Sequence, residues 1–285
     1  MPELPEVETI KRQLKPDIVG KIISDIEIFS PKNFIGNKRD VIEKKVISVD
    51  RYGKVLVIQC RDITRNARTI YLNIHFKLSG QILFSKDINN AVFKNIIPFT
   101  GGKTMPANTT RVIIKFTDGS GLFFNDLRKF GWIKISDQPL KPKGIDVLSK
   151  EFTPQLINSL THKTRKPIKV LLMDQDLITG IGNIYANDSL FLAKIHPQRA
   201  SNSLTEKEIS LLYKSIKQTI NEGVQDLGSS RADEAFILPD GSRGGHQRNF
   251  LVYQQEGKPC INCKTIIRRI KHNGRSSFLC PSCQK

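Results

Sequence analysis

The chain has 285 residues, of which 39% are hydrophobic, so it is long and apolar enough for two domains and is not an intrinsically disordered chain. No apolar run approaches the roughly 18 residues that span a bilayer, which excludes a membrane-spanning protein. Lys and Arg number 45 against 27 Asp and Glu, and the resulting net charge of +18 favours a polyanionic partner such as nucleic acid, although a basic solubilising surface would give the same count.

A short helix is predicted at the start of the chain. Val7, Ile10 and Leu14 recur at helical spacing, which indicates a helix over residues 4–15, and Gly20 ends this pattern. The opening segment MPELPEVET carries three glutamates and no basic residue, the opposite of a secretory or organelle-targeting segment. We therefore expect an intracellular, cytoplasmic protein.

Eight strand-like runs follow, with no helical pattern between them. Turn signals such as Tyr52-Gly53 and Asp118-Gly119 separate the runs. In chain order the runs are KIISDIEIF, KKVISVD, GKVLVIQC, TIYLNIHF, QILFS, RVIIKF, GLFFND and WIKIS. Consecutive short strands of this kind predict an antiparallel sandwich or barrel-like domain, in which residues 87–109 form a long loop.

The pattern becomes helical after a segment rich in proline and lysine at 139–143, which indicates a linker. The run from Thr205 to Glu208 is a capping box, and it is followed by apolar residues that line one face of a long helix. These residues are Ile209, Leu212, Ile216 and Ile220. Residues 228–249 are rich in Gly, Ser and Arg and show little periodicity, which predicts a mobile loop.

Four of the five cysteines lie near the C-terminus in the arrangement CxxC–x16–CxxC. They are Cys260, Cys263, Cys280 and Cys283. Two such knuckles can supply four thiolates tetrahedrally, which predicts one structural Zn²⁺ with no open catalytic position. The fifth, Cys60, ends an apolar run and is predicted to be a buried thiol.

The residues between the two knuckles alternate like a strand pair. Asn273-Gly274 offers the left-handed conformations of a tight hairpin turn, and Arg275 follows directly. Residues 257–285 contain seven Lys or Arg and no Asp or Glu, so Arg275 is predicted to contact phosphate. The alternative is a solvated basic hairpin that only caps the fold.

Several motifs occur together in one order: PELPEVET at the start, a lysine in RYGK, DLRKFG, GIGNIYAND and the four-cysteine ribbon. With these motifs the chain resembles the formamidopyrimidine-DNA glycosylases over essentially its whole length. The resemblance implies an α+β chain, in which an N-terminal antiparallel β-sandwich with flanking helices precedes a helix–two-turns–helix domain and a zinc ribbon. The expected boundaries are 1–136 for the sandwich, 137–150 for the linker, 151–250 for the helical domain and 251–285 for the ribbon.

The resemblance implies a bifunctional glycosylase and lyase that excises oxidised purines from double-stranded DNA. Met1 would be removed, and the exposed amine of Pro2 would form a Schiff base with the sugar, followed by β,δ-elimination. Glu3 would be the general acid/base, and Glu6 would order the segment. From the residues alone, Glu3, Glu6 and Glu8 are better interpreted as helix N-terminal acids favoured by the helix dipole.

The resemblance also implies DNA contacts outside the N-terminus. Lys54 and His75 match family residues that contact phosphates, although a strand lysine is usually solvent-facing and a strand histidine is more often a core residue. Three side chains would fill the gap left by the extruded nucleotide. They are Leu78, where the family usually has methionine, Arg128 and Phe130, for which packing beside Trp132 is the alternative.

The run GIGN matches the turn of the helix–two-turns–helix element. The resemblance implies that Gly180 and Gly182 let the backbone approach a phosphate, which Asn183 and the helix amides would bind, with Lys169 as a further contact. Residues 228–249 occupy the place of the family's lesion-recognition loop and are longer and differently composed than its common pattern.

Three other interpretations remain open from the sequence. An endonuclease VIII-type relative would excise oxidised pyrimidines, although PELPEVE favours the purine branch. A non-catalytic zinc-dependent DNA-binding protein would keep Met1, and a transcriptional zinc-ribbon protein would explain only the C-terminus. We expect a monomer that is associated with the nucleoid.

Overall fold

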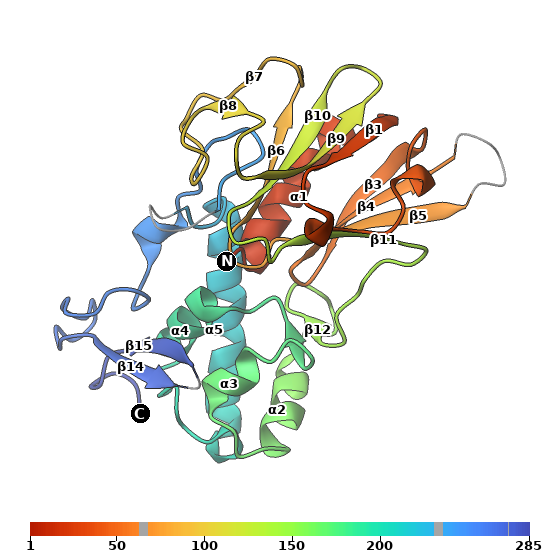
Figure 1. Cartoon of the computed structure of the whole chain (residues 1–285). Coiled ribbons are helices and arrows are strands. Elements are labelled where there is room, and N and C mark those ends of the chain that lie inside the picture. Colours follow the sequence, from red (N-terminus) through yellow and green to blue (C-terminus); the bar gives the residue numbers. More distant parts are fainter. Residues whose placement is uncertain (63–67, 231–235, 273) are drawn as a thin grey trace. The chain divides into compact units, whose positions relative to one another are not determined.

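The computed structural model describes residues 1–62, 68–230, 236–272 and 274–285. The chain divides into two compact units (Figure 1). The first contains residues 1–141 and 226–247, and the second contains residues 142–225 and 248–285. The domain boundaries expected from the sequence remain predictions, and the division by contacts differs from them in placing 226–247 with the first unit.

Two β-sheets form most of the first unit (Figure 1). One has the order β1 (Ile23–Ile28), β9 (Thr110–Phe116), β10 (Gly121–Asp126) and β6 (Gly80–Ser85). The other has the order β2 (Phe34–Ile35), β11 (Trp132–Ser136), β5 (Thr69–His75), β4 (Val55–Arg61) and β3 (Lys45–Tyr52). All eight predicted runs are strands, and they pair antiparallel. The short β2 adds a parallel pair with β11.

Both sheets bury their inner faces in one apolar core, which makes the unit a sandwich. Ile114 of β9 and Leu72 of β5 belong to this core, together with Leu14 of helix α1 (Leu4–Ile18). The helix is three residues longer than the predicted 4–15. Cys60 is fully buried in the same core, as predicted.

The segment predicted as a loop at 87–109 contains two short strands, β7 (Ala91–Val92) and β8 (Thr104–Met105). They pair antiparallel and carry a second small core with Leu83 and Phe123. Two-residue strands have no periodicity to detect, which explains why the sequence predicted only a loop. The first unit also has short 3-10 turns at Pro31–Asn33 and Lys38–Asp40.

The second unit is mainly helical. Its helices are α2 (Pro154–His162), α3 (Ile168–Leu172), α4 (Asn183–Leu192) and α5 (Glu206–Gln225), and a short parallel pair joins β12 (Ile145–Asp146) to β13 (Ile178–Thr179). The ribbon hairpin consists of β14 (Arg268–His272) and β15 (Arg275–Leu279). A further 3-10 turn lies at Ser201–Ser203, and another, His246–Asn249, contains the boundary between the two units in the chain. Among the described residues, no helix is both long and apolar enough to cross a bilayer.

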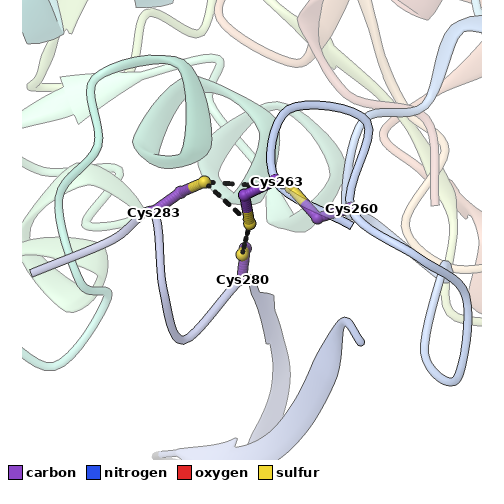
Figure 2. A group of neighbouring side chains, drawn as sticks. All are labelled: Cys260, Cys263, Cys280 and Cys283. Atoms are coloured by element: carbon purple, nitrogen blue, oxygen red, sulfur yellow. Dashed lines mark hydrogen bonds between the residues drawn. The ribbon is translucent and has the colours of Figure 1, made fainter. Parts of the chain in front are cut away.

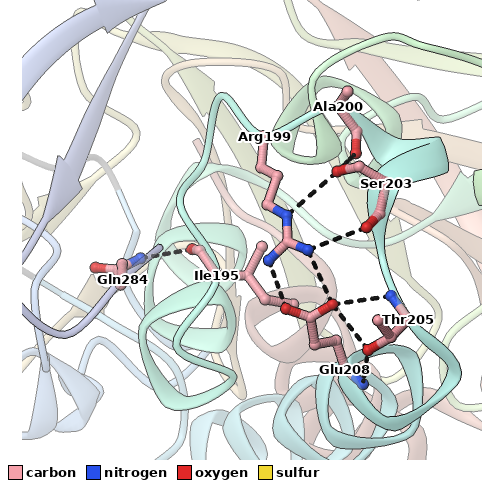
Figure 3. A network of polar contacts seen from close by, with 7 residues as sticks. All are labelled: Ile195, Arg199, Ala200, Ser203, Thr205, Glu208 and Gln284. Atoms are coloured by element: carbon pink, nitrogen blue, oxygen red, sulfur yellow. Dashed lines mark hydrogen bonds and ion pairs between the residues drawn. The ribbon is translucent and has the colours of Figure 1, made fainter.

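The predicted capping box at the start of α5 is confirmed. The amide of Thr205 donates to Glu208 Oε2 at 2.8 Å, and the amide of Glu208 donates to Thr205 Oγ1 at 3.3 Å. Arg199 forms an ion pair with the same Glu208 and donates to the carbonyl of Ser203 at 3.0 Å (Figure 3). These bonds attach the connection between α4 and α5 to the first turn of α5. Gln284, near the C-terminus of the chain, donates a hydrogen bond to the carbonyl of Ile195, and this bond is 2.9 Å long.

Candidate functional site

Pro2 and Glu3 lie buried at the start of α1. Glu3 is the N-cap of the helix and is only 3% exposed. Its amide donates to Glu6 Oε2 at 2.8 Å, and a reciprocal bond from the amide of Glu6 completes a capping box. Helix capping therefore accounts for the placement of both glutamates, and it fixes the backbone beside Pro2.

Glu6 also joins the N-terminal segment to the start of the 228–249 segment. Its Oε1 accepts a hydrogen bond from the amide of Ser229 at 2.9 Å. The described part of that segment is tied down further, because Ser230 Oγ accepts from the amide of Gly244 at 2.9 Å and His246 contacts Asp226 at 2.9 Å. Residues 231–235 of the predicted lesion loop lie outside the described residues.

Lys54 lies in the turn between β3 and β4 and is only 6% exposed. The preceding Arg51 donates to the carbonyl of Gly53 at 2.7 Å and to Glu8 of α1 at 3.1 Å. Burial tends to raise the pKa of Glu8, but hydrogen bonds from nearby basic side chains, including Arg51, hold it below its usual value. A charged Glu8 thus ties α1 to the turn that carries Lys54.

His75 is the last residue of β5 and lies opposite Val55, the neighbour of Lys54 in sequence. Its Nδ1 accepts from the amide of Lys77 at 3.0 Å, and its ring lies 5.6 Å from that of Trp132. Burial, with the charges of Lys77 and Lys54, lowers the pKa of His75 to about 4. The imidazole is therefore neutral near pH 7 and carries its proton on Nε2, which makes it a hydrogen-bond donor.

The three predicted gap-filling residues are all exposed. Leu78 lies in the β5–β6 loop and is 44% exposed, and Phe130 in the β10–β11 loop is 53% exposed. Arg128 lies in the second loop with Phe130 and is exposed as well. The structure therefore does not support the alternative in which Phe130 packs beside Trp132 in the core. The buried residues Ser79 and Asp126 join the two loops through a hydrogen bond. The sequence analysis identified neither residue.

In the second unit, Asn183 is the first residue of α4 and follows Gly182, the N-cap. This position places Asn183 at the N-terminal end of a helix, where the helix dipole favours an anion, and its phosphate contact stays a prediction. The carbonyl of Asn183 accepts from Asn187 Nδ2 at 2.6 Å. Gln175 braces the preceding turn, since its amide group donates to the carbonyl of Ile181 at 2.8 Å.

Lys169 was predicted to contact phosphate, but the structure places it in the interior of the second unit. It is 2% exposed, and its ammonium donates to Ser276 O at 2.8 Å and Ser277 Oγ at 2.9 Å. The amide of Phe278 donates to Asn187 Oδ1 at 2.8 Å. Lys169 and Asn187 therefore anchor β15 of the ribbon to the helical part, a function that sequence reasoning missed.

The four ribbon cysteines gather at one point, with their sulfurs all within 4.8 Å of one another (Figure 2). The Sγ atoms of Cys263 and Cys280 are 3.4 Å apart, and those of Cys260 and Cys283 are 3.9 Å apart. Tetrahedral zinc with bonds of about 2.3 Å requires sulfurs about 3.8 Å apart, so the donor set fits Zn²⁺ in type, number and spacing.

The ribbon hairpin has the predicted strand pairing, in which His272 faces Arg275. Arg275 is exposed at the start of β15, and its guanidinium lies 3.8 Å from Met173 Sδ. The predicted turn residue Asn273 lies outside the described residues. The predicted site residues thus fall into two groups. Pro2, Glu3, Glu6, Lys54, His75, Leu78, Arg128 and Phe130 belong to the first unit, and Lys169, Asn183, Arg275 and the four cysteines belong to the second.

Sequence comparison matches three family models to this chain. Residues 1–133 match the formamidopyrimidine-DNA glycosylase N-terminal domain, residues 144–234 its H2TH domain, and residues 257–285 a zinc finger found in FPG and IleRS. A formamidopyrimidine-DNA glycosylase of Pelotomaculum thermopropionicum is 34% identical over 297 residues, covering 100% of this chain and 99% of the relative.

Solved structures give the same result. A point mutant of the Lactococcus lactis FPG in complex with Fapy-dG-containing DNA has a TM-score of 0.84 and 31% identity, with 100% of both chains covered. The wild-type L. lactis FPG (MutM) in complex with DNA that contains an oxidised pyrimidine has a TM-score of 0.83 and 32% identity over the same coverage.

Proposed function

The chain belongs to the formamidopyrimidine-DNA glycosylase family, and from this premise we propose that it excises oxidised purines from duplex DNA and then cleaves the strand through its N-terminal proline. The glycosylase activity follows from membership at 34% identity over the full chain. The lyase step, the lesion class and the role of each residue are the proposal. The lesions are 8-oxoguanine and formamidopyrimidines, the latter being the lesion class in the L. lactis complex.

The chemistry begins with removal of Met1, which frees the secondary amine of Pro2. An α-amino group titrates closer to neutrality than a lysine, so a useful fraction of it is unprotonated near pH 7. The nitrogen attacks the anomeric carbon of the damaged nucleotide, and the base leaves with the electrons of the glycosidic bond. The resulting iminium acidifies the sugar protons, so that the two flanking phosphates depart by successive β- and δ-eliminations.

Glu3 is the general acid/base of this proposal. It protonates the sugar ring oxygen as the ring opens, which lets the iminium form. The observation that carries the assignment is the burial of Pro2 and Glu3 together at the capped start of α1, where Glu3 is 3% exposed.

The other residues bind and position the DNA. Lys54 and the Nε2–H of His75 are suited to phosphates beside the lesion, and Asn183 to a phosphate at the start of α4. Leu78, Arg128 and Phe130 fill the space of the extruded nucleotide. Arg275 contacts DNA from a ribbon whose fold one structural Zn²⁺ stabilises through four thiolates, so the metal supplies structure and leaves no coordination position for the reaction.

The binding partner that we propose is double-stranded DNA with an oxidised base. In this proposal the protein acts as a monomer in the cytoplasm, in association with the nucleoid. Solved relatives were captured on DNA with a Fapy-dG or an oxidised pyrimidine. The net charge of +18 suits a polyanion of this kind.

Borohydride trapping tests the proposal. Reduction during turnover on an 8-oxoguanine duplex should capture a covalent adduct that peptide mapping assigns to Pro2. Pro2→Gly should reduce trapping and strand scission far more than DNA binding, whereas Pro5→Ala is the matched proline control and should retain them. Active protein that still begins with Met1, or an adduct on a lysine side chain, would contradict the mechanism.

Oxidised pyrimidines are a second candidate substrate class, because the L. lactis relative was solved on DNA with such a lesion. Single-turnover excision from matched duplexes that differ only in the lesion ranks the classes. Faster release of 8-oxoguanine than of thymine glycol is expected, and the reverse order would move the chain to a pyrimidine-specific function.

A further inference from the structure

Two loops of the first unit cross between its sheets at the same end of the sandwich. Residues 76–79 lead from β5 in the five-stranded sheet to β6 in the four-stranded sheet, and residues 127–131 return from β10 to β11. The strand register places them side by side, because Asp126 pairs with Gly80 and Trp132 pairs with His75. Three exposed side chains, Leu78, Arg128 and Phe130, belong to these two loops.

A single buried carboxylate joins the loops. Asp126 ends β10 and is 0% exposed. Its Oδ1 accepts from the hydroxyl of Ser79 and from the amide of Arg128 at 3.2 Å, and its Oδ2 accepts from the amide of Gly131 at 2.6 Å. Ser79 Oγ also accepts from the amide of Arg128 at 3.0 Å, so the hydroxyl and carboxylate form one closed network across both loops.

Both loops hold backbone conformations that need support. Lys77 and Lys129 adopt the left-handed region, with φ of 49° and 55°, which is unfavourable for residues with a Cβ. Glycines at the ends of the two loops also lie close to neighbouring atoms. A Cβ on Gly80 would lie 2.5 Å from Phe76 O, and a Cβ on Gly131 would lie 3.1 Å from Asp126 Oδ2. Such conformations persist where surrounding contacts over-determine them. His75 Nδ1 holds the amide of Lys77, and Asp126 holds the amides of Arg128 and Gly131 on either side of Lys129.

We infer that Asp126, acting with Ser79, is a positioning residue for nucleotide extrusion, because its carboxylate holds Leu78, Arg128 and Phe130 as one rigid wedge. The inference rests on the proposed function, since a wedge has a role only in an enzyme that extrudes its target nucleotide. Side chains that enter a duplex must keep their relative places while the bases unstack, and a supporting layer of hydrogen bonds provides that rigidity. Asp126 itself is buried and acts through the loops that it joins.

Asp126→Asn tests this inference with little change in volume. The substituted amide has one oxygen acceptor in place of two, and its NH₂ group cannot accept from the amide of Gly131. Two substrates separate positioning from chemistry: 8-oxoguanine paired with cytosine, and the same lesion in a three-nucleotide unpaired bubble, where unstacking is already complete. Single-turnover excision by the full-length protein should slow by about tenfold or more on the paired lesion and by less than about threefold in the bubble.

Fluorescence of 2-aminopurine next to the lesion gives a second readout. Its rise on unstacking should be slower with Asp126→Asn than with the wild type, while borohydride trapping in the bubble stays near the wild-type level. Asp87→Asn is the matched control. Asp87 accepts from the amides of Asn89 at 2.9 Å and Asn90 at 3.4 Å in an exposed turn that follows the opposite end of β6 from the wedge.

An equal slowing on both substrates, or no slowing on the paired lesion, would overturn the inference. If Asp126→Asn does not fold, Ser79→Ala decides the matter, because it removes only the hydroxyl that joins the loops. It should show the same split between substrates, and Ser79→Thr, which restores a hydroxyl, should recover the paired-substrate rate. A wild-type protein that releases no base from either substrate and forms no adduct would instead refute the proposed function.

Discussion

At the scale of single residues, burial sets the chemical state of the side chains in the first unit. Burial raises the pKa of the Cys60 thiol to about 12, so this cysteine stays protonated and unreactive. Burial also keeps His75 neutral, and the hydrogen bond that its Nδ1 accepts from Lys77 leaves the proton on Nε2. His75 can therefore offer DNA a hydrogen bond near pH 7 without adding to the positive charge of the protein.

The pKa of His75 leads to a testable pH dependence of stability. Burial, then the charges of Lys77 and Lys54, lower it from 6.5 to about 4 in the folded chain. Between these values the unfolded chain binds a proton that the folded chain does not, so acidification favours unfolding. We expect the difference in unfolding free energy between the wild type and His75→Gln to be constant above pH 6.5. It should fall by about 3 kcal/mol between pH 6.5 and pH 4.

Trp132 provides the measurement for this prediction, because it is the only tryptophan of the chain and its ring lies 5.6 Å from His75. Its fluorescence follows both urea unfolding at each pH and the titration of the folded protein. The folded-state midpoint should lie near 4 and disappear in His75→Gln, whereas His162→Gln, at an exposed position in the second unit, should retain it. A midpoint near 6.5 would mean that His75 is open to solvent.

At the scale of elements, the sequence predicted the parts that carry their own periodic signal. The alternation of apolar residues and the turn signals located all eight long strands, and the pattern from Thr205 to Glu208 located the start of α5. The short strands β7 and β8 were not predicted, because two residues show no period. The contacts that place 226–247 with the sandwich were not predictable either, since they join residues far apart in the chain.

The sequence predicted which residues belong to the site but not which contacts they make. Family motifs identified Arg128 and Phe130, and the structure exposes both. The same motif contains Asp126. From sequence alone, a polar residue at the end of a strand is expected to face solvent. The strand register and the burial of Asp126 show instead that it lies between two loops. Lys169 is the opposite case, a basic residue expected on the surface whose ammonium is enclosed by the ribbon. Its phosphate contact stays a prediction.

Removal of one zinc thiolate tests the ribbon as an element. Cys280 is fully buried in a small apolar cluster with Phe191 and Phe278, and the zinc site supports this cluster. Cys280→Ser should lose zinc and expose the amides of β14 and β15 to hydrogen exchange. Affinity for DNA should fall by about tenfold or more as the basic hairpin loses its order.

The control for this variant is Cys60→Ala, which removes the one cysteine outside the ribbon. It should keep one zinc per chain and wild-type affinity for DNA. Zinc content measured by mass spectrometry decides the first point and titration with labelled duplex the second. Unchanged affinity of zinc-free Cys280→Ser would show that the ribbon takes no part in DNA binding.

At the scale of the whole molecule, the basic residues that give the positive net charge are of two kinds. Some contact DNA phosphates in the proposed complex, and others do not. The formal charge of +18 does not distinguish them, but the contacts do. Lys38 is paired with Asp25 at 3.0 Å, whereas Arg275 is exposed on a ribbon that contains no acidic residue between 257 and 285. Only an arginine or lysine that neutralises a phosphate releases counterions from DNA, so the salt dependence of binding separates the two kinds.

Arg275→Ala and Lys38→Ala each lower the formal charge by one, from +18 to +17, and so test contact against net charge. For Arg275→Ala, the slope of log K against log salt concentration should become shallower by about 0.9, the value for one phosphate contact. For Lys38→Ala the slope should match the wild type, because Lys38 forms an ion pair with Asp25 and does not neutralise a DNA phosphate. Zinc content must stay at one per chain, which ensures that the ribbon is intact. Equal changes in slope for the two variants would mean that DNA responds to the overall charge of the protein, and Arg275 would then lose its assigned contact.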